Sequence, residues 1–213
     1  MIRLLFLLVG YAFGCLQTSF FYGKKRGVDI REHGSGNAGT TNALRVMGKK
    51  AGIIVFIGDM GKLFVAVLLM LLIFGHLGEE YRLLIKLYTG FGVVLGHDFP
   101  LFMNFKGGKG VASTAALILI LDWRMAVIGI ILFFSIALLT HIVSLASCVT
   151  LILELGCLIW LVLARLLSSG IMPLWEPIAV FAAIVLLSLT RHSDNIKRLL
   201  KGEEKKIDSA FKK

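Results

Sequence analysis

The residues best suited to chemistry lie in one polar stretch, DIREHGSGNAGTTNALRVMGKK, at positions 29–50. Its glycines permit positive φ angles and a close approach of the backbone to a ligand. Consecutive N–H groups in such turns bind anions, and a helix that begins after Thr41 would add the positive end of its dipole. Arginines and lysines in the stretch add full charges for phosphate oxygens. We interpret it as a binding loop for a phosphorylated small molecule; the alternative is a basic connector between two membrane helices.

Nucleotide-binding motifs do not explain this loop. The run GSGNAG at 34–39 has the spacing of a dinucleotide-binding motif. However, the charged segment DIREH precedes it, where that motif requires a strand. The chain also contains no G-x4-G-K-[ST] sequence. A nucleotide is therefore not the expected ligand.

A second glycine-rich loop occurs in the segment GHDFPLFMNFKGGKG at 96–110. Pro100 ends or kinks the preceding helix. Glycines around Lys106 and Lys109 form a flexible, cationic turn that is rich in N–H groups, at the start of the next helix. Lysines in an inner loop often serve only membrane topology, but the glycines between them favour phosphate contact. His97 by itself is typical of a hydrogen-bonded histidine at the membrane interface.

Polar residues also interrupt the apolar segments. Asp59 and Lys62 share a helix face at i and i+3, and each costs about 2.5–3.5 kcal/mol at the centre of a membrane helix. We interpret them as a structural ion pair that anchors the first loop; direct contact with a substrate is the alternative. Ser144 and Ser147 have the spacing of small residues that pack helices together. Cations in the run RHSDNIKR at 191–198 are ordinary partners of a helix C-terminus.

The rest of the chain determines where these residues can lie. Of its 213 residues 57% are hydrophobic, the mean hydropathy is +0.86, and the charged fraction of 17% is below the roughly 25% of soluble proteins. These values predict one polytopic membrane domain over residues 1–213. The net charge of +10 does not indicate a nucleic acid partner, because the basic residues cluster in a few loops and the tail. The three cysteines lack paired spacing, so we expect them to pack helices.

The apolar runs predict an all-α integral membrane protein with about seven transmembrane helices. Basic residues gather between the first and second helices, between the third and fourth, and in the tail, which places the N-terminus outside and the C-terminus in the cytoplasm. Both glycine-rich loops then face the cytoplasm. The segment EEKKIDSAFKK, which follows Gly202, is predicted to be a solvated tail. The expected helices are roughly 4–22, 53–74, 83–103, 110–121, 124–140, 143–164 and 177–191.

Three clusters occur in order on this topology: GSGNAGTTNALR (34–45), GHDFPLFMNFKGGKGVA (96–112) and RHSDNIKRLL (191–200). Together they resemble the bacterial integral-membrane acyl-phosphate:glycerol-3-phosphate acyltransferase family, and the likeness covers nearly the whole chain. The resemblance implies an enzyme of the bacterial cytoplasmic (inner) membrane with its active site on the cytoplasmic face. It would transfer a fatty acyl group from acyl phosphate to the sn-1 hydroxyl of glycerol 3-phosphate, giving lysophosphatidic acid and phosphate, the first step of phospholipid synthesis.

The resemblance also implies which residues form the site. His192 and His97 are candidates for the base that takes the hydroxyl proton, and a phosphate oxygen of the substrate is the alternative. Ser35 and Lys109 join them as catalytic residues. The implied substrate- and phosphate-binding residues are Gly34, Gly36, Asn37, Gly39, Thr41, Asn42, Arg45, Lys106, Gly107, Gly108, Ser144 and Asn195.

The implied reaction suits these residue types. Acyl phosphate is already activated, so the enzyme needs no covalent nucleophile, metal or cofactor; it must position two anions and stabilise an oxyanion. The expected partners are the two substrates and the bilayer, and the oligomeric state stays open. The chain contains no H-x4-D motif, which argues against acyltransferases that use CoA or a carrier protein. The alternative is a membrane transporter or binding protein for an organic phosphate, although the inverted repeats typical of transporters are not visible.

The chain departs from the family pattern in two places. His141 and Ile142 occupy positions where family members often have an arginine and an aromatic residue, which weakens any phosphate role at position 141. Leu63 replaces the glycine that usually follows Asp-x-x-Lys, and we expect this change to adjust packing.

Overall fold

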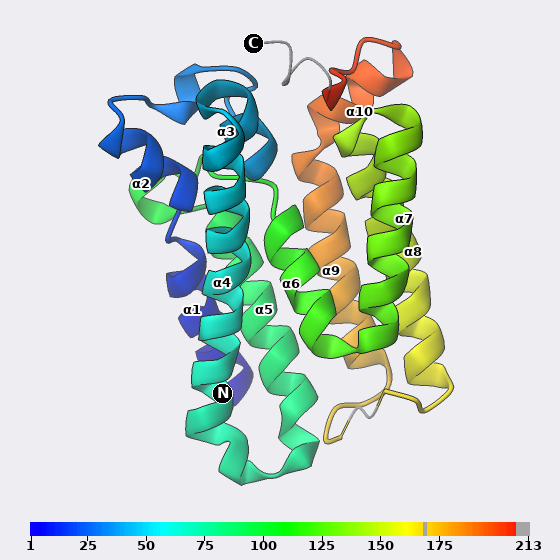
Figure 1. Ribbon diagram of the computed structural model, residues 1–213. Coiled ribbons are helices and arrows are strands. Elements are labelled where there is room, and N and C mark those ends of the chain that lie inside the picture. Colours follow the sequence, from blue (N-terminus) through cyan, green and yellow to red (C-terminus); the bar gives the residue numbers. More distant parts are fainter. Residues whose placement is uncertain (168–169, 208–213) are drawn as a thin grey trace.

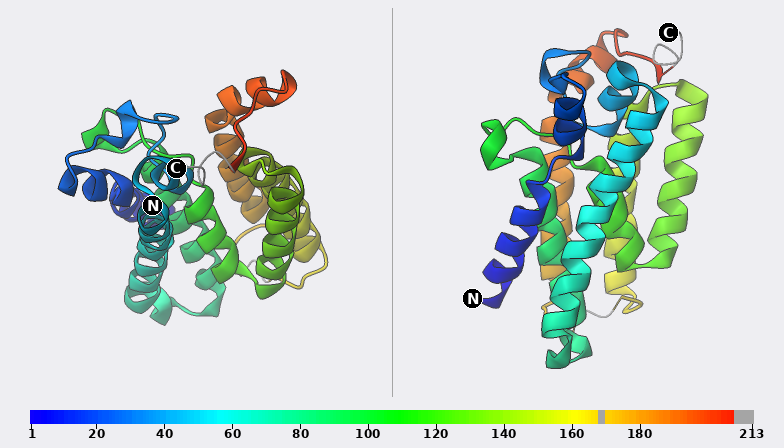
Figure 2. Two further views of the ribbon diagram at one scale, coloured as in Figure 1. Left: turned by 45° about the horizontal axis from the view of Figure 1, so that its top comes forward. Right: turned by 60° about the vertical axis from the view of Figure 1, so that its left-hand side comes forward.

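The computed structural model describes residues 1–167 and 170–207, and this part of the chain is helical, without strands. Long helices run side by side in a bundle, and shorter ones gather at the end that carries the glycine-rich loops (Figures 1 and 2). The α-helices are α1 (Ile2–Gly14), α2 (Thr18–Lys25), α3 (Thr40–Met47), α4 (Lys49–Phe74), α5 (Arg82–Asp98), α6 (Val111–Leu121), α7 (Trp123–Thr140), α8 (Val143–Leu163), α9 (Trp175–Arg191) and α10 (Ser193–Leu200). Single 3-10 turns are η1 (Ile30–Glu32), η2 (Gly75–Leu77), η3 (Glu79–Tyr81) and η4 (Leu101–Met103).

Every apolar helix expected from the sequence is present, but not all have spanning length. Within the described residues, four helical segments are long and apolar enough to cross a membrane: Ile2–Lys25, which joins α1 and α2, Lys49–Leu77, Trp123–Thr140 and Val143–Leu163. A fifth is added if α9 and α10, which meet at 60°, form one bent span. α5 and α6 have only 17 and 11 residues. The prediction of about seven spanning helices is thus supported for four or five of them. The end of the predicted tail, residues 208–213, lies outside the described residues.

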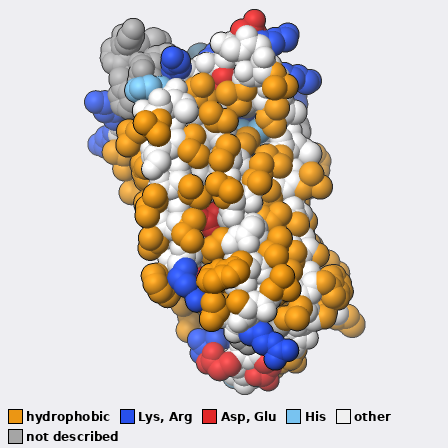
Figure 3. All heavy atoms as spheres, turned by 90° about the vertical axis from the view of Figure 1, so that its right-hand side faces the viewer, with side chains coloured by type: hydrophobic (Ala, Val, Ile, Leu, Met, Phe, Trp, Pro, Cys, Tyr) orange, Lys and Arg blue, Asp and Glu red, His pale blue; other side chains and the backbone are white. Residues whose placement is uncertain are grey.

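The outer face of the bundle has the character of a membrane surface. On the side of α7 and α8, a broad apolar band lies between ends that carry most of the charged side chains (Figure 3). Apolar side chains can face lipid without losing hydrogen bonds, whereas charged ones cannot. The exposed apolar residues of these two helices include Val127, Ile131, Phe134, Leu138, Leu139, Ile152, Leu153 and Trp160.

The first predicted helix, 4–22, is broken into α1 and α2. α1 ends at Gly14 and α2 begins at Thr18. Lys62 Nζ donates to the carbonyl oxygens of Gly14 and Leu16, at 3.1 Å each. A break in a buried helix leaves carbonyl groups without partners, so a donor from another helix must satisfy them. The local sequence pattern could not reveal this break because the lysine comes from α4.

The third predicted helix, 83–103, ends earlier than expected. α5 stops at Asp98, so the expectation that Pro100 would end or kink the helix is confirmed. Asn104 and Phe105 then adopt left-handed backbone angles, with φ of 52° and 59°. These angles turn the chain back toward α5 and bring the second glycine-rich loop over its C-terminal end.

α6 is too short to cross a membrane alone. Its 11 residues span about 16 Å, roughly half of the ~30 Å hydrocarbon layer. α6 begins partway down the bundle, directly after the second glycine-rich loop (Figure 1). The loop is therefore recessed among the longer helices, where it can meet both a water-soluble substrate and a lipid chain.

α1 and α5 pack with their backbones in contact. Each helix presents a pair of glycines four residues apart, Gly10 and Gly14 on α1 and Gly92 and Gly96 on α5. A Cβ on Gly10 would collide with the carbonyl oxygen of Thr89. This spacing of small residues allows close helix approach in membranes. The fully buried core side chains near this pair and between the other helices include Phe6, Leu63, Leu84, Leu117, Leu158 and Phe181.

Candidate active site

Asn42, at the start of α3, shapes the first glycine-rich loop. Its Nδ2 donates to the carbonyl oxygens of Ile30 and His33, at 3.2 and 3.0 Å. Its Oδ1 accepts a hydrogen bond from the backbone N–H of Ser35 at 2.8 Å. At Gly34 φ is +67°, and a Cβ there would collide with Asn42 Oδ1, so the turn requires glycine. Asn42 therefore holds the loop in shape from within the protein.

The second glycine-rich loop is held from two sides. The N–H of Gly107 donates to Asp98 O at 3.1 Å, and the N–H of Gly108 donates to His97 O at 2.9 Å. A Cβ on Gly108 would overlap the His97 ring, so only glycine lets the loop lie this close to α5. From α9, Nε and Nη2 of Arg191 each donate to Gly108 O at 3.1 Å. α5 and α9 together therefore fix the loop.

A buried ion pair supports the second loop through His97. Asp59 Oδ1 and Lys62 Nζ are 3.2 Å apart, and their side chains are 1% and 5% exposed. Lys62 Nζ also donates to His97 Nδ1 at 2.8 Å, and Ser113 Oγ of α6 donates to Asp59 O at 3.2 Å. An ammonium group can only donate, so the proton of the neutral His97 ring is on Nε2. The predicted Asp59–Lys62 ion pair is present, and it connects α4 with α5 and α6. It supports the second glycine-rich loop, whereas the prediction placed it under the first.

Glu204 joins α8 and α10 at the edge of the site. Its Oε1 accepts from Ser144 Oγ of α8 at 3.0 Å and from Asn195 Nδ2 of α10 at 2.5 Å. Its Oε2 accepts from Arg198 Nε at 2.7 Å, and Asn195 Oδ1 accepts from Lys109 Nζ. The Glu204 side chain is only 5% exposed. The prediction of a solvated tail is therefore wrong at this residue, because its carboxylate is drawn to the surrounding cations.

Cationic groups are in excess around the site. The cavity between the loops is lined by Arg45, Lys106, Lys109, Arg191, Arg198 and Lys205, and by the acidic Asp59, Asp194 and Glu204. Burial lowers the pKa of Lys109 to about 8, and Glu204 opposes this shift. Burial also lowers the pKa of Arg45, whose Nε has no hydrogen-bond partner within residues 1–167 and 170–207. A bound anion would favour the charged forms and supply the missing acceptor.

His192 connects α9 to α10 and is 3% exposed. Its Nδ1 lies 2.7 Å from Ser188 O, and a carbonyl oxygen can only accept, so Nδ1 carries the proton and Nε2 keeps its lone pair. Burial, together with the charge of Lys109, lowers the His192 pKa to about 4. The imidazole is therefore neutral at pH 7 and can accept a proton at Nε2.

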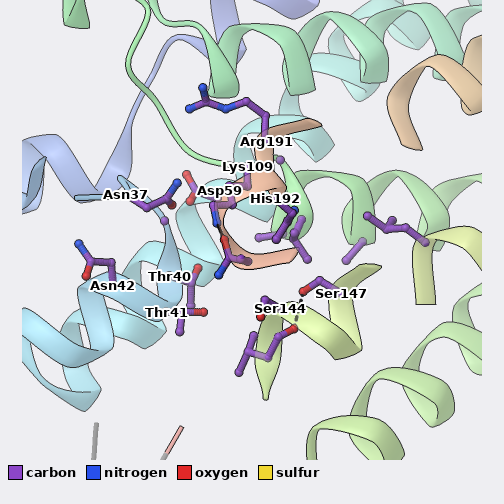
Figure 4. A pocket seen from close by; sticks show the side chains of 18 of the residues that line it. Asn37, Thr40, Thr41, Asn42, Asp59, Lys109, Ser144, Ser147, Arg191 and His192 are labelled. Carbon is purple, nitrogen blue, oxygen red and sulfur yellow. Dashed lines mark hydrogen bonds between the residues drawn. The ribbon is translucent and has the colours of Figure 1, made fainter. Parts of the chain in front are cut away.

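A cavity of about 990 Å³ extends from these polar groups into the bundle. Lys109 and His192 lie near its centre in Figure 4, with Thr40 and Thr41 on one side and Ser144 and Ser147 on the other. We call its other, non-polar part the apolar groove. The groove is lined by Phe56 and Met60 of α4, Ala115, Ile118 and Leu119 of α6, Ala126, Ile130, Phe133 and Phe134 of α7, and Leu151 of α8.

The structure brings the predicted site residues together. All of them except Gly108 line the cavity. His97 lies between Lys62 and the backbone of Gly108, under the second loop. Among the described residues, no group of three or more His, Cys, Asp or Glu side chains is placed to hold a metal ion. Sequence reasoning gave no site role to Thr40, Arg191, Arg198 or Glu204, which also line the cavity.

The sequence pointed to three of these missed residues to different degrees. Arg191 and Arg198 fall within the quoted run RHSDNIKR, where they were interpreted only as partners of a helix end. Glu204 stands in a run of charges, and nothing in that run distinguishes it from its neighbours. Its role depends on Ser144, which is 60 residues away in the chain.

The fold and the cavity define an integral membrane protein in which a cluster of cationic and polar side chains continues into an apolar groove. The glycerol-3-phosphate acyltransferase family model matches residues 4–202, and the chain belongs to this family. It is 37% identical to glycerol-3-phosphate acyltransferase 2 of Thermotoga maritima and 39% identical to glycerol-3-phosphate acyltransferase of Listeria welshimeri. Each match covers 96% of both chains.

Solved structures agree with this assignment. Two crystal structures of PlsY (YgiH), an integral membrane glycerol 3-phosphate acyltransferase, have the same fold. The glycerol 3-phosphate form superimposes with a TM-score of 0.80 at 32% identity, covering 97% of this chain and 96% of that one. The lysophosphatidic acid form gives 0.79 at 30% identity and covers 100% of both chains. The protein is therefore an acyltransferase, which decides against the transporter alternative.

Proposed function

We propose that this enzyme transfers a fatty acyl group from acyl phosphate to the sn-1 hydroxyl of glycerol 3-phosphate, giving lysophosphatidic acid and phosphate. The observation that carries the proposal is that two cationic, glycine-rich loops and an apolar groove share one cavity. Acyl phosphate has an anionic head and an apolar tail, and glycerol 3-phosphate brings a second phosphate. The similarity to PlsY in glycerol 3-phosphate and lysophosphatidic acid forms supports the acceptor and the product.

In this proposal each loop binds one phosphate group. The first loop offers Ser35, Asn37 and Arg45, and the second offers Lys106 and Lys109, all of which line the cavity. A substrate phosphate supplies acceptors that the protein lacks near Arg45, as its Nε has none among the described residues. Leaving a buried donor without a partner costs about 1–3 kcal/mol, so this arrangement is better explained by a ligand than by stability.

The reaction then requires alignment more than activation. The sn-1 hydroxyl oxygen attacks the carbonyl carbon of acyl phosphate, and a tetrahedral oxyanion forms. The bond from that carbon to the bridging phosphate oxygen breaks, and phosphate leaves with the electron pair. Ser35 and Lys109 donate hydrogen bonds to the oxyanion or the leaving phosphate, which stabilises the charge where it develops. The remaining barrier is lowered by holding both substrates in reacting geometry.

The hydroxyl proton goes either to Nε2 of His192 or to a phosphate oxygen of the substrate. His192 suits the role because Ser188 fixes its tautomer and the ring is neutral at pH 7. His97 is less suited, since its Nδ1 already accepts from Lys62 and its other edge lies against Gly108. We therefore propose that His97 positions the second loop and that the base is His192 or the substrate phosphate.

The proposal places the enzyme in the bacterial cytoplasmic membrane with the cavity facing the cytoplasm. The basic residues of both glycine-rich loops support this orientation. Single cysteines at positions 79 and 109, in a variant without the native three, should differ toward an impermeant thiol reagent in sealed cells. Labelling is expected at 79 and not at 109. The reverse pattern would overturn the orientation.

The function itself is tested with purified protein, acyl phosphate and glycerol 3-phosphate. Release of phosphate and formation of lysophosphatidic acid are expected in equal amounts, and both should continue in the presence of a chelator and after Cys15, Cys148 and Cys157 are replaced by serine. Acyl-CoA in place of acyl phosphate is the control donor and should give no product. Product from acyl-CoA alone, or phosphate release without lysophosphatidic acid, would contradict the proposal.

A further inference from the structure

After α10 the chain turns back toward the bundle instead of running out into solvent (Figure 1). Gly202 adopts a φ of +72°, and the N–H of Glu203 donates to Arg198 O at 2.8 Å. This backbone bond and the positive φ are features of the Schellman motif, which closes a helix at a glycine and redirects the chain. We call residues 203–207, which follow this turn, the strap. Glu204 of the strap lines the cavity.

Glu204 occupies hydrogen-bond donors that an anionic ligand would use. Its carboxylate accepts from Ser144, Asn195 and Arg198 at 3.0, 2.5 and 2.7 Å. Asn195 Oδ1 in turn accepts from Lys109 Nζ, so the strap also engages the second glycine-rich loop. Carboxylate and phosphate oxygens are both charged acceptors and prefer the same donors. The Glu204 carboxylate therefore holds a set of donors suited to a phosphate.

A second anchor fixes the far end of the strap. The N–H of Ile207 donates to His141 O, on the turn between α7 and α8, at 2.7 Å. To open, the strap must break this bond and the three bonds of Glu204. A phosphate monoester carries a charge of about −1.5 to −2 at pH 7, more than the single charge of a carboxylate, so it can replace the three bonds of Glu204. It does not replace the bond of Ile207, which therefore opposes opening.

We propose that the strap competes with a substrate: Glu204 holds the donors of a substrate phosphate, and the strap opens when that phosphate binds. This inference rests on the proposed function, in which Lys109 and the groups around it bind substrate. The strap follows residues 4–202, the part of the chain that the family model matches. Removing Glu204 from the donors should therefore leave the chemistry itself intact.

The strap lowers the apparent affinity for the competing substrate. When only a fraction of the molecules is open, the apparent Kd rises by the inverse of that fraction, so a strap that is open in about one molecule in ten raises it about tenfold. Loss of the Glu204 carboxylate would remove this effect and tighten binding. A Glu204 that instead orients Ser144 and Asn195 for the substrate would give the opposite sign, because its loss would weaken binding.

The first test measures binding of inorganic phosphate to the purified full-length protein by isothermal titration calorimetry. Glu204→Ala should lower the Kd about tenfold, since no carboxylate then competes for the donors. Glu204→Gln keeps the size of the side chain without its charge and should lower the Kd as well, so it carries the test if the alanine variant does not fold. Glu203→Ala, at the exposed neighbouring glutamate, is the matched control and should leave the Kd unchanged. A Kd that is unchanged or higher in the Glu204 variants overturns the inference.

The second test identifies the substrate with which the strap competes. KM is measured separately for glycerol 3-phosphate and for acyl phosphate, each with the other substrate saturating. In Glu204→Ala the KM of at least one substrate should fall about tenfold without a loss of kcat, and that substrate is the competitor. A lower phosphate Kd with neither KM reduced also overturns the inference, because the strap would then cover donors that no substrate uses. Absence of turnover in the unchanged enzyme, whatever the phosphate Kd, refutes the proposed function instead.

Discussion

The two ends of the bundle differ in how their charged side chains are balanced. At the end remote from the glycine-rich loops, Arg3 Nη2 donates to Glu176 Oε2 at 2.9 Å, and Tyr88 Oη donates to the same carboxylate at 2.7 Å. Asp122 and Arg124 are paired there as well. At the loop end, lysines and arginines around the cavity outnumber the acidic side chains by six to three. One of those three, Asp59, already pairs with Lys62.

This difference separates scaffold from site. Charges that are matched one to one satisfy each other and hold helices together, so they have little affinity left for a ligand. Cations that remain in excess in a partly buried space favour an anion strongly, because water screens them poorly there. The loop end contains both kinds: Asp59 pairs with Lys62, while Arg45, Lys106 and Lys109 line the cavity and, in the proposed function, bind the substrate phosphates. Substitutions at each place should therefore give different phenotypes.

The largest effect is expected at the scaffold pair. Lys62→Met leaves Asp59 buried without its partner and removes the donor from the carbonyls of Gly14 and Leu16. We expect the free energy of unfolding to fall by about 3–5 kcal/mol, measured by denaturant titration in detergent. The double variant Asp59→Asn with Lys62→Met should recover part of this loss, since no buried charge stays unpaired. If the free energy of unfolding falls equally in the single and the double variant, Asp59 and Lys62 are not coupled.

At the site, removal of a cation should lower kcat/KM and leave the protein folded. Lys109→Ala removes a charged donor from the cavity, and kcat/KM per folded molecule should fall about tenfold to a hundredfold. Lys109→Arg keeps the charge with a different shape and should recover part of this loss. Lys201→Ala, at an exposed position of the same end, serves as control. Nearly normal kcat/KM in Lys109→Ala would assign the second loop to the scaffold.

The pH dependence tests the same cation without changing its size. Lys109 has a pKa of about 8 because burial disfavours its charge, so it is protonated below that pH and neutral above it. As pH rises through about 8, kcat/KM should fall, by up to about tenfold per pH unit. In Lys109→Arg the charge persists, so this decline should disappear. A decline that is the same in both proteins would have to come from another group.

The smallest effect is expected at the opposite end. Glu176→Gln weakens the pair with Arg3, whose side chain is 39% exposed, so water screens much of the interaction. The free energy of unfolding should fall by about 1 kcal/mol or less, and kcat/KM should remain close to that of the unchanged enzyme. A marked loss of activity without a loss of stability would show that the matched end also contributes to catalysis.

Local sequence determined the parts of this protein that depend on neighbouring residues. Apolar runs had to become buried or lipid-facing helices, because water does not accept so much apolar surface. Glycines next to lysine or arginine had to form turns with N–H groups and positive charge, which is why the two loops could be predicted as anion-binding. The Asp59–Lys62 pair was visible because both residues share a helix turn.

Contacts between distant segments were decided only by the tertiary structure. The break between α1 and α2 depends on Lys62, which is 48 residues from Gly14. Glu204 looked like one charge among many in a tail, and only the folded chain brings it to Ser144, Asn195 and Arg198. Likewise, only the folded chain brings the buried Glu154 of α8 against Gly129 of α7. In each case the energy of a buried polar group is set by the neighbours that folding supplies, and neighbours from other helices leave no periodic pattern in the sequence.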